Sequence, residues 1–261
     1  MTNIFLHNIN PVLIDFGTLK LTYYGLAYAI GIILGVWQLK KINKKEGLTS
    51  DKNIDDIVVY SIVGIILGGR LGYVFFYKPM EYLSDPIDIF KTWEGGMSFH
   101  GGLIGLILGI FLYCKKYKIQ LWKMADAIVL VGPIGLFLGR IANFINGELF
   151  GRPTDGSWGV IFPYGGKIPR HPSQLYEAFL EGVVLYTLLN VLYYKTDIYK
   201  KQKALSGAFL IGYGIFRSIA ELFREPDLHI GYIGNLTMGQ ILCIPMIIAG
   251  IYLVLKSGKK T

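Results

Sequence analysis

Runs of apolar residues alternate with short polar blocks along the whole chain. Seven runs are long enough to cross a hydrocarbon core of about 30 Å, which takes roughly 20 residues of α-helix. We therefore predict seven transmembrane helices, at about 20–39, 54–77, 97–114, 124–146, 173–194, 205–223 and 237–255. The expected fold is an all-α integral membrane protein with one membrane domain over residues 1–261. Its two longest outer loops, 78–96 and 147–172, are too short to form separate domains.

The lysines indicate how these helices are oriented. The blocks after the first, third, fifth and seventh helices hold sixteen of the 26 Lys and Arg residues, and all sixteen are lysine. Basic residues gather on the cytoplasmic side of membrane proteins, so we expect the N-terminus outside and the C-terminus in the cytoplasm. The first twenty residues lack the charged start and apolar run of a cleavable signal peptide, and the first helix is expected to remain.

The composition agrees with a membrane protein. Hydrophobic residues make up 52% of the chain and charged residues 17%, with a mean hydropathy of +0.45. The net charge of +8 lies in separate blocks and not on one face, which argues against a nucleic-acid partner. Cys114 and Cys243 have no metal-ligand spacing and are too few for a disulfide framework, so neither a metal nor a soluble cofactor is expected.

Glycines recur at every fourth position in three of the predicted helices. This small-residue pattern lets membrane helices approach closely. It predicts tight helix packing at Gly64, Gly68 and Gly72, at Gly101, Gly105 and Gly109, and at Gly135 and Gly139.

The six arginines all lie inside the predicted helices or on the outer side. Arg70, Arg140 and Arg217 each precede the outer end of a helix by six or seven residues, which corresponds to a depth of roughly 10 Å. An arginine at that depth is costly unless it faces the bundle interior or a wet cleft. Arginine also binds phosphate or carboxylate through two parallel hydrogen bonds. These arginines therefore predict a phosphate site at the outer level, or else they reach the headgroups or pair with carboxylates for structure.

Other polar residues gather at the same level. The sequence GRIANFINGELFGR at 139–152 puts Asn143, Asn146 and Glu148 close to Arg140, and further helices bring Tyr24, His100, Gln174, Tyr213 and Glu221. The inner halves of the helices hold little comparable; Asp126 is the main exception and lies near the inner surface. We therefore expect a site confined to the outer leaflet, at the depth of lipid headgroups.

His100 is the candidate proton acceptor, because an imidazole titrates near neutral pH, although a lone histidine is also a common structural residue. The chain shows no nucleophile-elbow serine, no paired aspartates and no cysteine beside an outer base. The nucleophile is therefore expected to come from a partner.

Four separated segments carry a resemblance to a known family. In chain order they are SFHGG at 98–102, the stretch from Gly139 to Gly151, RHPSQLYE at 170–177 and YGIFRSIAELFREPD at 213–227. In this order, and over nearly the whole chain, they resemble prolipoprotein diacylglyceryl transferase. The resemblance implies transfer of the diacylglyceryl group of phosphatidylglycerol to the cysteine thiol of a lipoprotein signal peptide, with a thioether formed and glycerol phosphate released. It also implies a bacterial cytoplasmic membrane protein whose site faces the outer leaflet.

Roles follow for the candidate residues. His100 is expected to act as general base, and Arg140 and Arg217 to bind the phosphate. Asn143 and Asn146 would orient lipid oxygens or hold Arg140, while Glu148 and Glu221 would position arginines. Further substrate contacts are expected from Tyr24, Arg70, Gly151, Gln174 and Tyr213. The resemblance supports Tyr24, His100, Arg140, Asn143, Glu148, Gly151, Arg217 and Glu221 as functional positions.

Two other classes of function stay open at this point. A lipid or anionic-solute transporter also fits arginines at the outer level, but it needs a polar path through the inner half. An intramembrane peptidase or acyltransferase needs a nucleophile or paired acids of its own.

Overall fold

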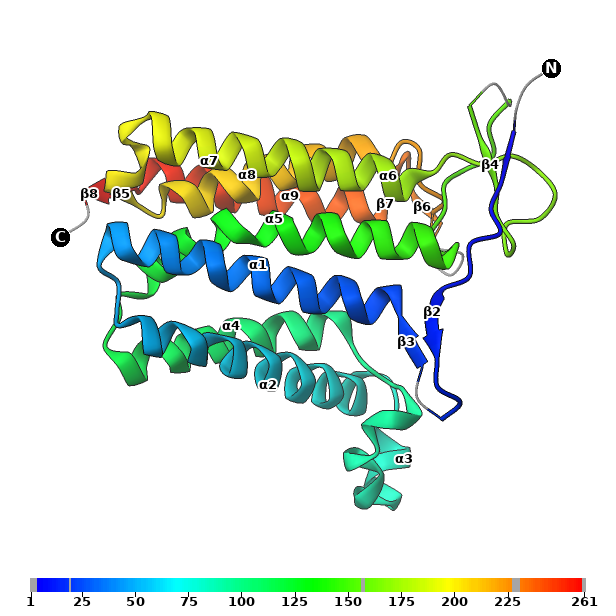
Figure 1. Ribbon diagram of the computed structural model, residues 1–261, viewed down its shortest axis with the longest axis horizontal. Helices are drawn as coiled ribbons and strands as arrows, with labels where there is room; N and C mark the ends of the chain where they lie inside the picture. Colours follow the sequence, from blue (N-terminus) through cyan, green and yellow to red (C-terminus); the bar gives the residue numbers. More distant parts are fainter. Residues whose placement is uncertain (1–3, 19, 156–157, 227–230, 260–261) are drawn as a thin grey trace. The chain divides into compact units, whose positions relative to one another are not determined.

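The computed structural model describes residues 4–18, 20–155, 158–226 and 231–259, which are mostly helical (Figure 1). Within these residues, six helices are long and apolar enough to cross a membrane. They are α1 (Tyr23–Glu46), α2 (Asp51–Phe76), α4 (Phe99–Tyr117), α5 (Leu121–Asn146), the continuous helix Ser173–Lys195 and α9 (Met238–Leu255). A shorter apolar helix, α8, covers Ala204–Ala220. The prediction of a multi-pass membrane protein is confirmed.

The helix Ser173–Lys195 is not a uniform α-helix. It consists of α6 (Ser173–Glu177), a π-helical stretch labelled η3 (Ala178–Val184) and α7 (Leu185–Lys195). Such π-helical turns are rare and are frequent at functional sites.

Two helix ends differ from the predicted runs. α1 continues past residue 39 to Glu46, because its last polar turns are good helix formers and end in Lys44 and Lys45, which are favourable near a helix C-terminus. α8 ends at Ala220 and not at 223. There the backbone carbonyls of Glu221, Phe223 and Arg224 accept hydrogen bonds from Arg152, so the chain leaves the helix to pair with the loop after α5.

Short elements connect the helices. Strand β1 (Phe5–Leu6) pairs in parallel with β4 (Val160–Ile161), and three antiparallel pairs join β2 (Val12–Asp15) to β3 (Lys20–Thr22), β5 (Lys201–Gln202) to β8 (Gly258–Lys259), and β6 (Tyr232–Ile233) to β7 (Leu236–Thr237). The remaining short elements are the α-helix α3 (Pro79–Ser84) and three 3₁₀ helices, η1 (Pro86–Phe90), η2 (Thr92–Glu94) and η4 (Asp197–Lys200).

The chain folds as two compact units. The first unit comprises Met1–Gln38 and Ala125–Thr261, and the second comprises Leu39–Met124. In the second unit α2 packs on α4 through the predicted glycines. A β-carbon added to Gly105 would lie 2.0 Å from the carbonyl oxygen of Gly64, and one on Gly101 would lie 2.3 Å from that of Gly68. The predicted close packing of these glycines is therefore confirmed.

In the first unit, α5, α8, α9 and the helix Ser173–Lys195 lie side by side (Figure 1). Gly182 of the π-helical stretch contacts α5, since a β-carbon there would lie 2.6 Å from Cβ of Phe137. At the N-terminal end of α8, the buried carboxylate of Asp126 accepts hydrogen bonds from the backbone N–H groups of Lys203 and Ser206. Asp126 therefore caps the start of α8 from a neighbouring helix.

Candidate functional site

Two buried glutamates define the centre of the site in the first unit. Glu177 ends α6, Glu181 lies one turn later in the π-helical stretch, and both side chains are fully buried. A buried carboxylate is costly unless charges or hydrogen bonds compensate it. Arginines from α5 and α8 supply that compensation.

Arg140 and Arg217 converge on one oxygen of Glu177. Nη2 of Arg140 lies 2.7 Å from Glu177 Oε2, and Nη1 of Arg217 lies 2.6 Å from the same atom. Glu181 is farther away, with its carboxylate oxygens 3.8 Å from Arg140 and 3.7 Å from Arg217, and neither oxygen accepts a hydrogen bond. The predicted site residues Arg140 and Arg217 thus meet, and they meet at carboxylates.

The end of α8 adds a second layer of charge. Arg217 also pairs with Glu221 one turn later, and Arg224 lies 3.5 Å from Oε1 of Glu177. Glu221 receives a further hydrogen bond of 2.8 Å from the Thr237 hydroxyl, which at the same time caps α9. Gly239 makes room for this carboxylate, because a β-carbon there would lie 2.6 Å from it. The cluster of Arg140, Arg217, Arg224, Glu177, Glu181 and Glu221 has no net charge when every member is ionised.

The stretch 139–152 closes one side of this cluster. The amides of Asn143 and Asn146 donate to Oε1 of Glu148 at 2.7 and 3.4 Å, and the Gln174 amide donates to the Glu148 carbonyl at 2.6 Å. Glu148 was expected to position an arginine. The structure instead pairs it with two amides, because the chain turns back at Gly147 and directs the carboxylate toward α5.

Beyond that turn, the backbone at Gly151 passes close to the segments that contain His171 and Phe223. A β-carbon on Gly151 would lie 2.3 Å from the Phe223 carbonyl and 2.7 Å from that of His171. Gly151 was predicted to contact substrate, whereas this geometry gives it a packing role between two loop segments. Asp227, the last residue of the motif after α8, lies outside the described residues.

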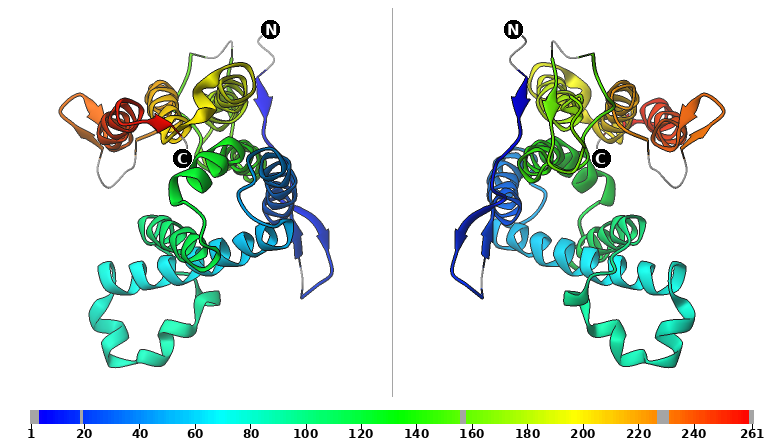
Figure 2. Two further views of the ribbon diagram at one scale, coloured as in Figure 1. Left: turned by 90° about the vertical axis from the view of Figure 1, so that its left-hand side faces the viewer. Right: turned by 90° about the vertical axis from the view of Figure 1, so that its right-hand side faces the viewer.

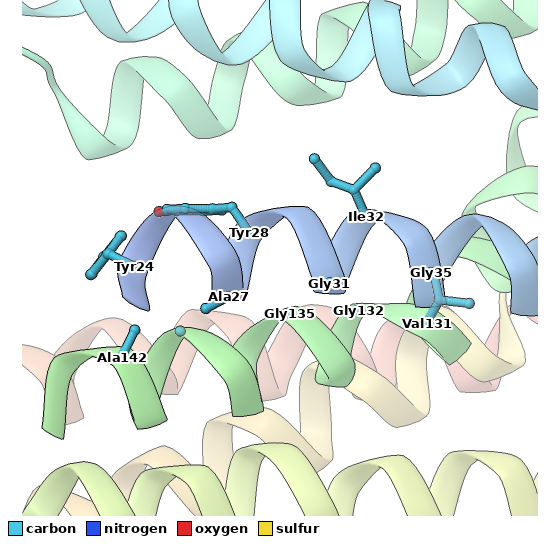
Figure 3. A pocket seen from close by; sticks show the side chains of 11 residues that line it. Tyr24, Ala27, Tyr28, Gly31, Ile32, Gly35, Val131, Gly132, Gly135 and Ala142 are labelled. Atoms are coloured by element: carbon cyan, nitrogen blue, oxygen red, sulfur yellow. The ribbon is translucent and has the colours of Figure 1, made fainter. Parts of the chain in front are cut away.

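Two of the predicted site residues are tyrosines, one on α8 and one on α1. Tyr213 precedes Arg217 by one turn of α8 and stacks on Phe209. Tyr24 opens α1 beside Tyr28, and both line a groove of about 300 Å³ between α1 and α5 (Figure 3). The groove is apolar because glycines and alanines face it; its walls include Gly31, Gly35, Gly135, Gly139 and Ala142. A β-carbon at Gly135 or Gly139 would meet nothing within 4 Å, so the predicted tight packing is wrong at Gly139. At Gly135 α1 does come near, since a β-carbon on Gly31 would lie 3.9 Å from its Cα.

Arg70 and His100 belong to the second unit. All five N–H groups of Arg70 donate to backbone carbonyls of the loop after α2, namely those of Asp88, Ile89, Lys91, Gly95 and Gly96. Arg70 was predicted to bind substrate, but this arrangement leaves it no free donor. His100 has an exposed side chain in the first turn of α4, beside Phe99.

Sequence reasoning missed Glu181, and it gave no role to Glu177, which ends the RHPSQLYE segment. Glu181 is an acidic residue inside an apolar run and lies four positions after Glu177, which is the signal that an intramembrane ionisable pair gives. Arg224, which lies beyond the end of α8, falls within the YGIFRSIAELFREPD segment but was given no role, and Thr237 and Gly239 gave no signal. No group of three or more potential metal ligands occurs within the described part of the chain.

Comparisons with known proteins place this geometry in context. A model of the prolipoprotein diacylglyceryl transferase family matches residues 11–256. A phosphatidylglycerol–prolipoprotein diacylglyceryl transferase of Rickettsia felis is 52% identical over 255 residues, covering 97% of this chain and 98% of that protein. Those of Rickettsia rickettsii (strain Sheila Smith) and Rickettsia bellii are 53% and 52% identical over 97% and 96% of the chain, and over 98% and 96% of their own lengths.

Proposed function

Because the chain belongs to the prolipoprotein diacylglyceryl transferase family and transfers the diacylglyceryl group of phosphatidylglycerol to a prolipoprotein cysteine, we propose that its buried arginines bind the phosphate of that lipid. One observation carries the proposal. Two guanidinium groups from different helices converge within 2.7 Å of a single buried oxygen, Oε2 of Glu177. That position suits any anionic oxygen, and a phosphate oxygen takes it from Glu177 when the lipid enters. The transporter and peptidase alternatives are set aside.

Glu177 does not lose all compensation in this exchange. Its other oxygen, Oε1, lies 3.5 Å from Arg224, so the carboxylate keeps one arginine while the phosphate takes Arg140 and Arg217. In the absence of lipid, Glu177 and Glu221 hold the two guanidinium groups at the correct place. Such preorganised charge is the main way in which enzymes stabilise charge that grows in a transition state.

The reaction follows from this arrangement. The thiolate of the prolipoprotein attacks the glycerol carbon that bears the phosphate, the carbon–sulfur bond forms and the carbon–oxygen bond breaks. Glycerol phosphate leaves with the bonding electrons, so its charge grows from one negative charge toward two. Arg140 and Arg217 bind this leaving group more strongly as its charge grows. The apolar groove between α1 and α5 accommodates an acyl chain of the same lipid.

The orientation completes the proposal. Seven helices cross the bacterial cytoplasmic membrane with the N-terminus outside, and the arginine cluster lies at the outer leaflet, where prolipoproteins present their cysteine. The block distribution of lysines supports this orientation. The test is transfer of labelled diacylglyceryl from phosphatidylglycerol to a synthetic lipobox peptide by the purified protein. Parental rates of transfer by both Arg140→Ala and Arg217→Ala would overturn the proposal that these arginines bind the phosphate.

We propose His100 as the base that accepts the thiol proton. A free thiol has a pKa of about 8.5, so most of it is protonated at neutral pH. We expect His100→Ala to lower transfer by roughly 10²- to 10⁴-fold at pH 7, and the loss to shrink as the pH rises past the thiol pKa. Added imidazole restores part of the activity if His100 is the base. A loss that neither pH nor imidazole changes would assign His100 a structural role.

A substitution at Glu181 is expected to strengthen lipid binding, whereas the previous substitution is expected to reduce activity. Its oxygens accept no hydrogen bond, so Glu181→Gln changes the charge of the cluster from zero to positive with little loss of structure. A more positive site binds an anionic lipid more tightly. We expect the apparent KM for phosphatidylglycerol to fall by roughly five- to tenfold, on the order of 1 kcal/mol of charge interaction. Glu225→Gln, at a half-buried carboxylate that pairs with Arg170 outside the cluster, serves as the matched control. An unchanged or raised KM for Glu181→Gln would contradict phosphate binding at this cluster.

A further inference from the structure

The segment that joins α2 to α4 exposes an unusual amount of apolar surface. Residues 76–99, here called the arm, contain α3, η1 and η2 and extend beyond the α2–α4 pair (Figure 2). Eight large apolar side chains of the arm are 62–83% exposed: Phe76, Tyr77, Met80, Leu83, Ile87, Phe90, Trp93 and Phe99. A loop in water would bury such side chains or replace them with polar ones.

The arm is nevertheless held firmly from inside. Arg70, which is 4% exposed, donates to five backbone carbonyls of the arm at 2.5–3.3 Å. Its guanidinium also lies 5.1 Å from the ring centre of Tyr82, and the Ser98 N–H donates to the Gly69 carbonyl. Irregular backbone persists at membrane depth only where its carbonyls have partners other than water. Arg70 provides those partners for this part of the arm.

Four of the six charged residues of the arm form ion pairs with one another. Lys78 pairs with Glu81 at 2.8 Å, and Lys91 pairs with Asp88 at 2.5 Å. Each pair joins residues three positions apart, so each can neutralise itself without a partner molecule. The arm also contains Asp85 and Glu94, so its sequence has a net charge of −2 beside the eight exposed apolar side chains.

The flanking helices indicate what covers this surface. Phe76 ends one apolar helix and Phe99 begins another, so the exposed side chains of the arm continue the exposed faces of α2 and α4, which include Leu71, Phe75 and Leu103. Aromatic residues such as Trp93 and Tyr77 favour the boundary between headgroups and acyl chains.

From this continuity we propose that the arm is embedded in the outer leaflet of the bilayer and contacts phospholipid, with Arg70 holding its backbone in place. The inference rests on the proposed orientation of the helices, and it is independent of the arginine cluster. Arg70 acts here as a structural residue and not as a substrate ligand. The partner is the lipid surface itself, and a second copy of the chain or a prolipoprotein is the alternative occupant that the test must distinguish.

Trp93 allows a direct test. A variant with Trp37→Phe, Trp122→Phe and Trp158→Phe retains Trp93 as its single tryptophan. We reconstitute it in phosphatidylcholine–phosphatidylglycerol vesicles whose acyl chains carry bromine either near the headgroup or near the chain end. We expect shallow bromine to quench roughly half of the Trp93 emission, deep bromine less, and aqueous iodide little, as for an interfacial tryptophan. A variant that also carries Trp93→Phe supplies the background.

The opposite pattern would overturn the proposal. Strong iodide quenching with no bromine quenching places the arm in water, and protection from both quenchers places another protein surface on it. Arg70→Gln, made in the same single-tryptophan chain, is expected to raise iodide quenching of Trp93 at least about twofold, because the carbonyls it leaves unpaired need water. If that variant does not fold, the quenching of the parent chain alone decides. The readout needs no transfer activity, so failure here is distinguishable from failure of the proposed function.

Discussion

Arg217→Ala is expected to reduce diacylglyceryl transfer by roughly 10³-fold, because it removes a preorganised charge from the leaving phosphate. In the structure Arg217 contacts Glu177 at 2.6 Å and also pairs with Glu221. Its loss removes both the proposed phosphate ligand and the partner of two buried carboxylates. The measurement is the initial rate of transfer to a lipobox peptide, with Arg140→Ala as a parallel variant from a different helix.

The second effect of this substitution must be separated from the first. Removing one partner of a buried ion pair costs about 3–5 kcal/mol of stability, which is enough to reduce the amount of folded protein. The double variant Arg217→Ala with Glu221→Gln removes one charge of each sign and keeps an acceptor for the Thr237 hydroxyl. We expect this double variant to be present in the membrane in the same amount as the parent protein and to show no transfer activity. Recovery of transfer by the double variant would mean that Arg217 only balances charge.

Arg217→Lys refines the assignment. Lysine keeps the positive charge but offers a point charge in place of a planar fork, so it cannot bridge two anionic oxygens in the same geometry. We expect transfer at least about tenfold below the parent, with normal amounts of folded protein. Full activity of this variant would show that charge suffices and that the geometry of the guanidinium does not matter.

Gly105→Ala is expected to have the largest effect on folding. The added methyl group would lie 2.0 Å from the Gly64 carbonyl and 2.9 Å from Cα of Gly68, and backbone atoms cannot move away without separating α2 from α4. Overpacking costs about 1–3 kcal/mol, and this contact belongs at or above the upper limit. A loss of that size lowers the melting temperature in detergent by about 10 °C, at 2–4 °C per kcal/mol.

Gly35→Ala is the matched control for that measurement. Gly35 is also a helical glycine in an apolar run, but a β-carbon there would meet nothing within 4 Å. We expect its melting temperature to equal or exceed that of the parent. Equal losses for both variants would mean that glycine content and not close approach determines the stability of these helices.

Much of the fold was predictable because hydrophobic length is a strong signal. All seven predicted runs contain a helix, and the glycines at every fourth position located the contact between α2 and α4. The same pattern failed at Gly139, and at Gly135 it located only an approach of Gly31. A glycine stripe shows that helices can approach closely, but whether they do so depends on what lies opposite, and across from Gly135 stands another glycine, Gly31, with the groove beside it.

The sequence predicted the arginines of the site better than its glutamates. Arginines in apolar helices are conspicuous, and Arg140 and Arg217 do meet. Their depth along the sequence could not reveal that Arg70 faces loop carbonyls, because partners that belong to the backbone leave no trace in side-chain patterns. Nor could the sequence show the π-helical stretch after Glu177. One extra residue in a helical turn is not marked by any particular residue type, so no sequence pattern predicts it.

The length of α8 has a consequence for the membrane around the protein. Its 17 residues span only about 25 Å, some 5 Å less than the hydrocarbon core. A short span creates hydrophobic mismatch, and lipids beside it compress or tilt to cover it. In the proposed orientation Asp126 lies at the inner end of α8, and the thinning would fall on the outer side, where Arg217 lies. In that orientation, neighbouring phospholipid headgroups would descend toward the guanidinium groups, and the bilayer itself would shorten the path of the lipid to its proposed site.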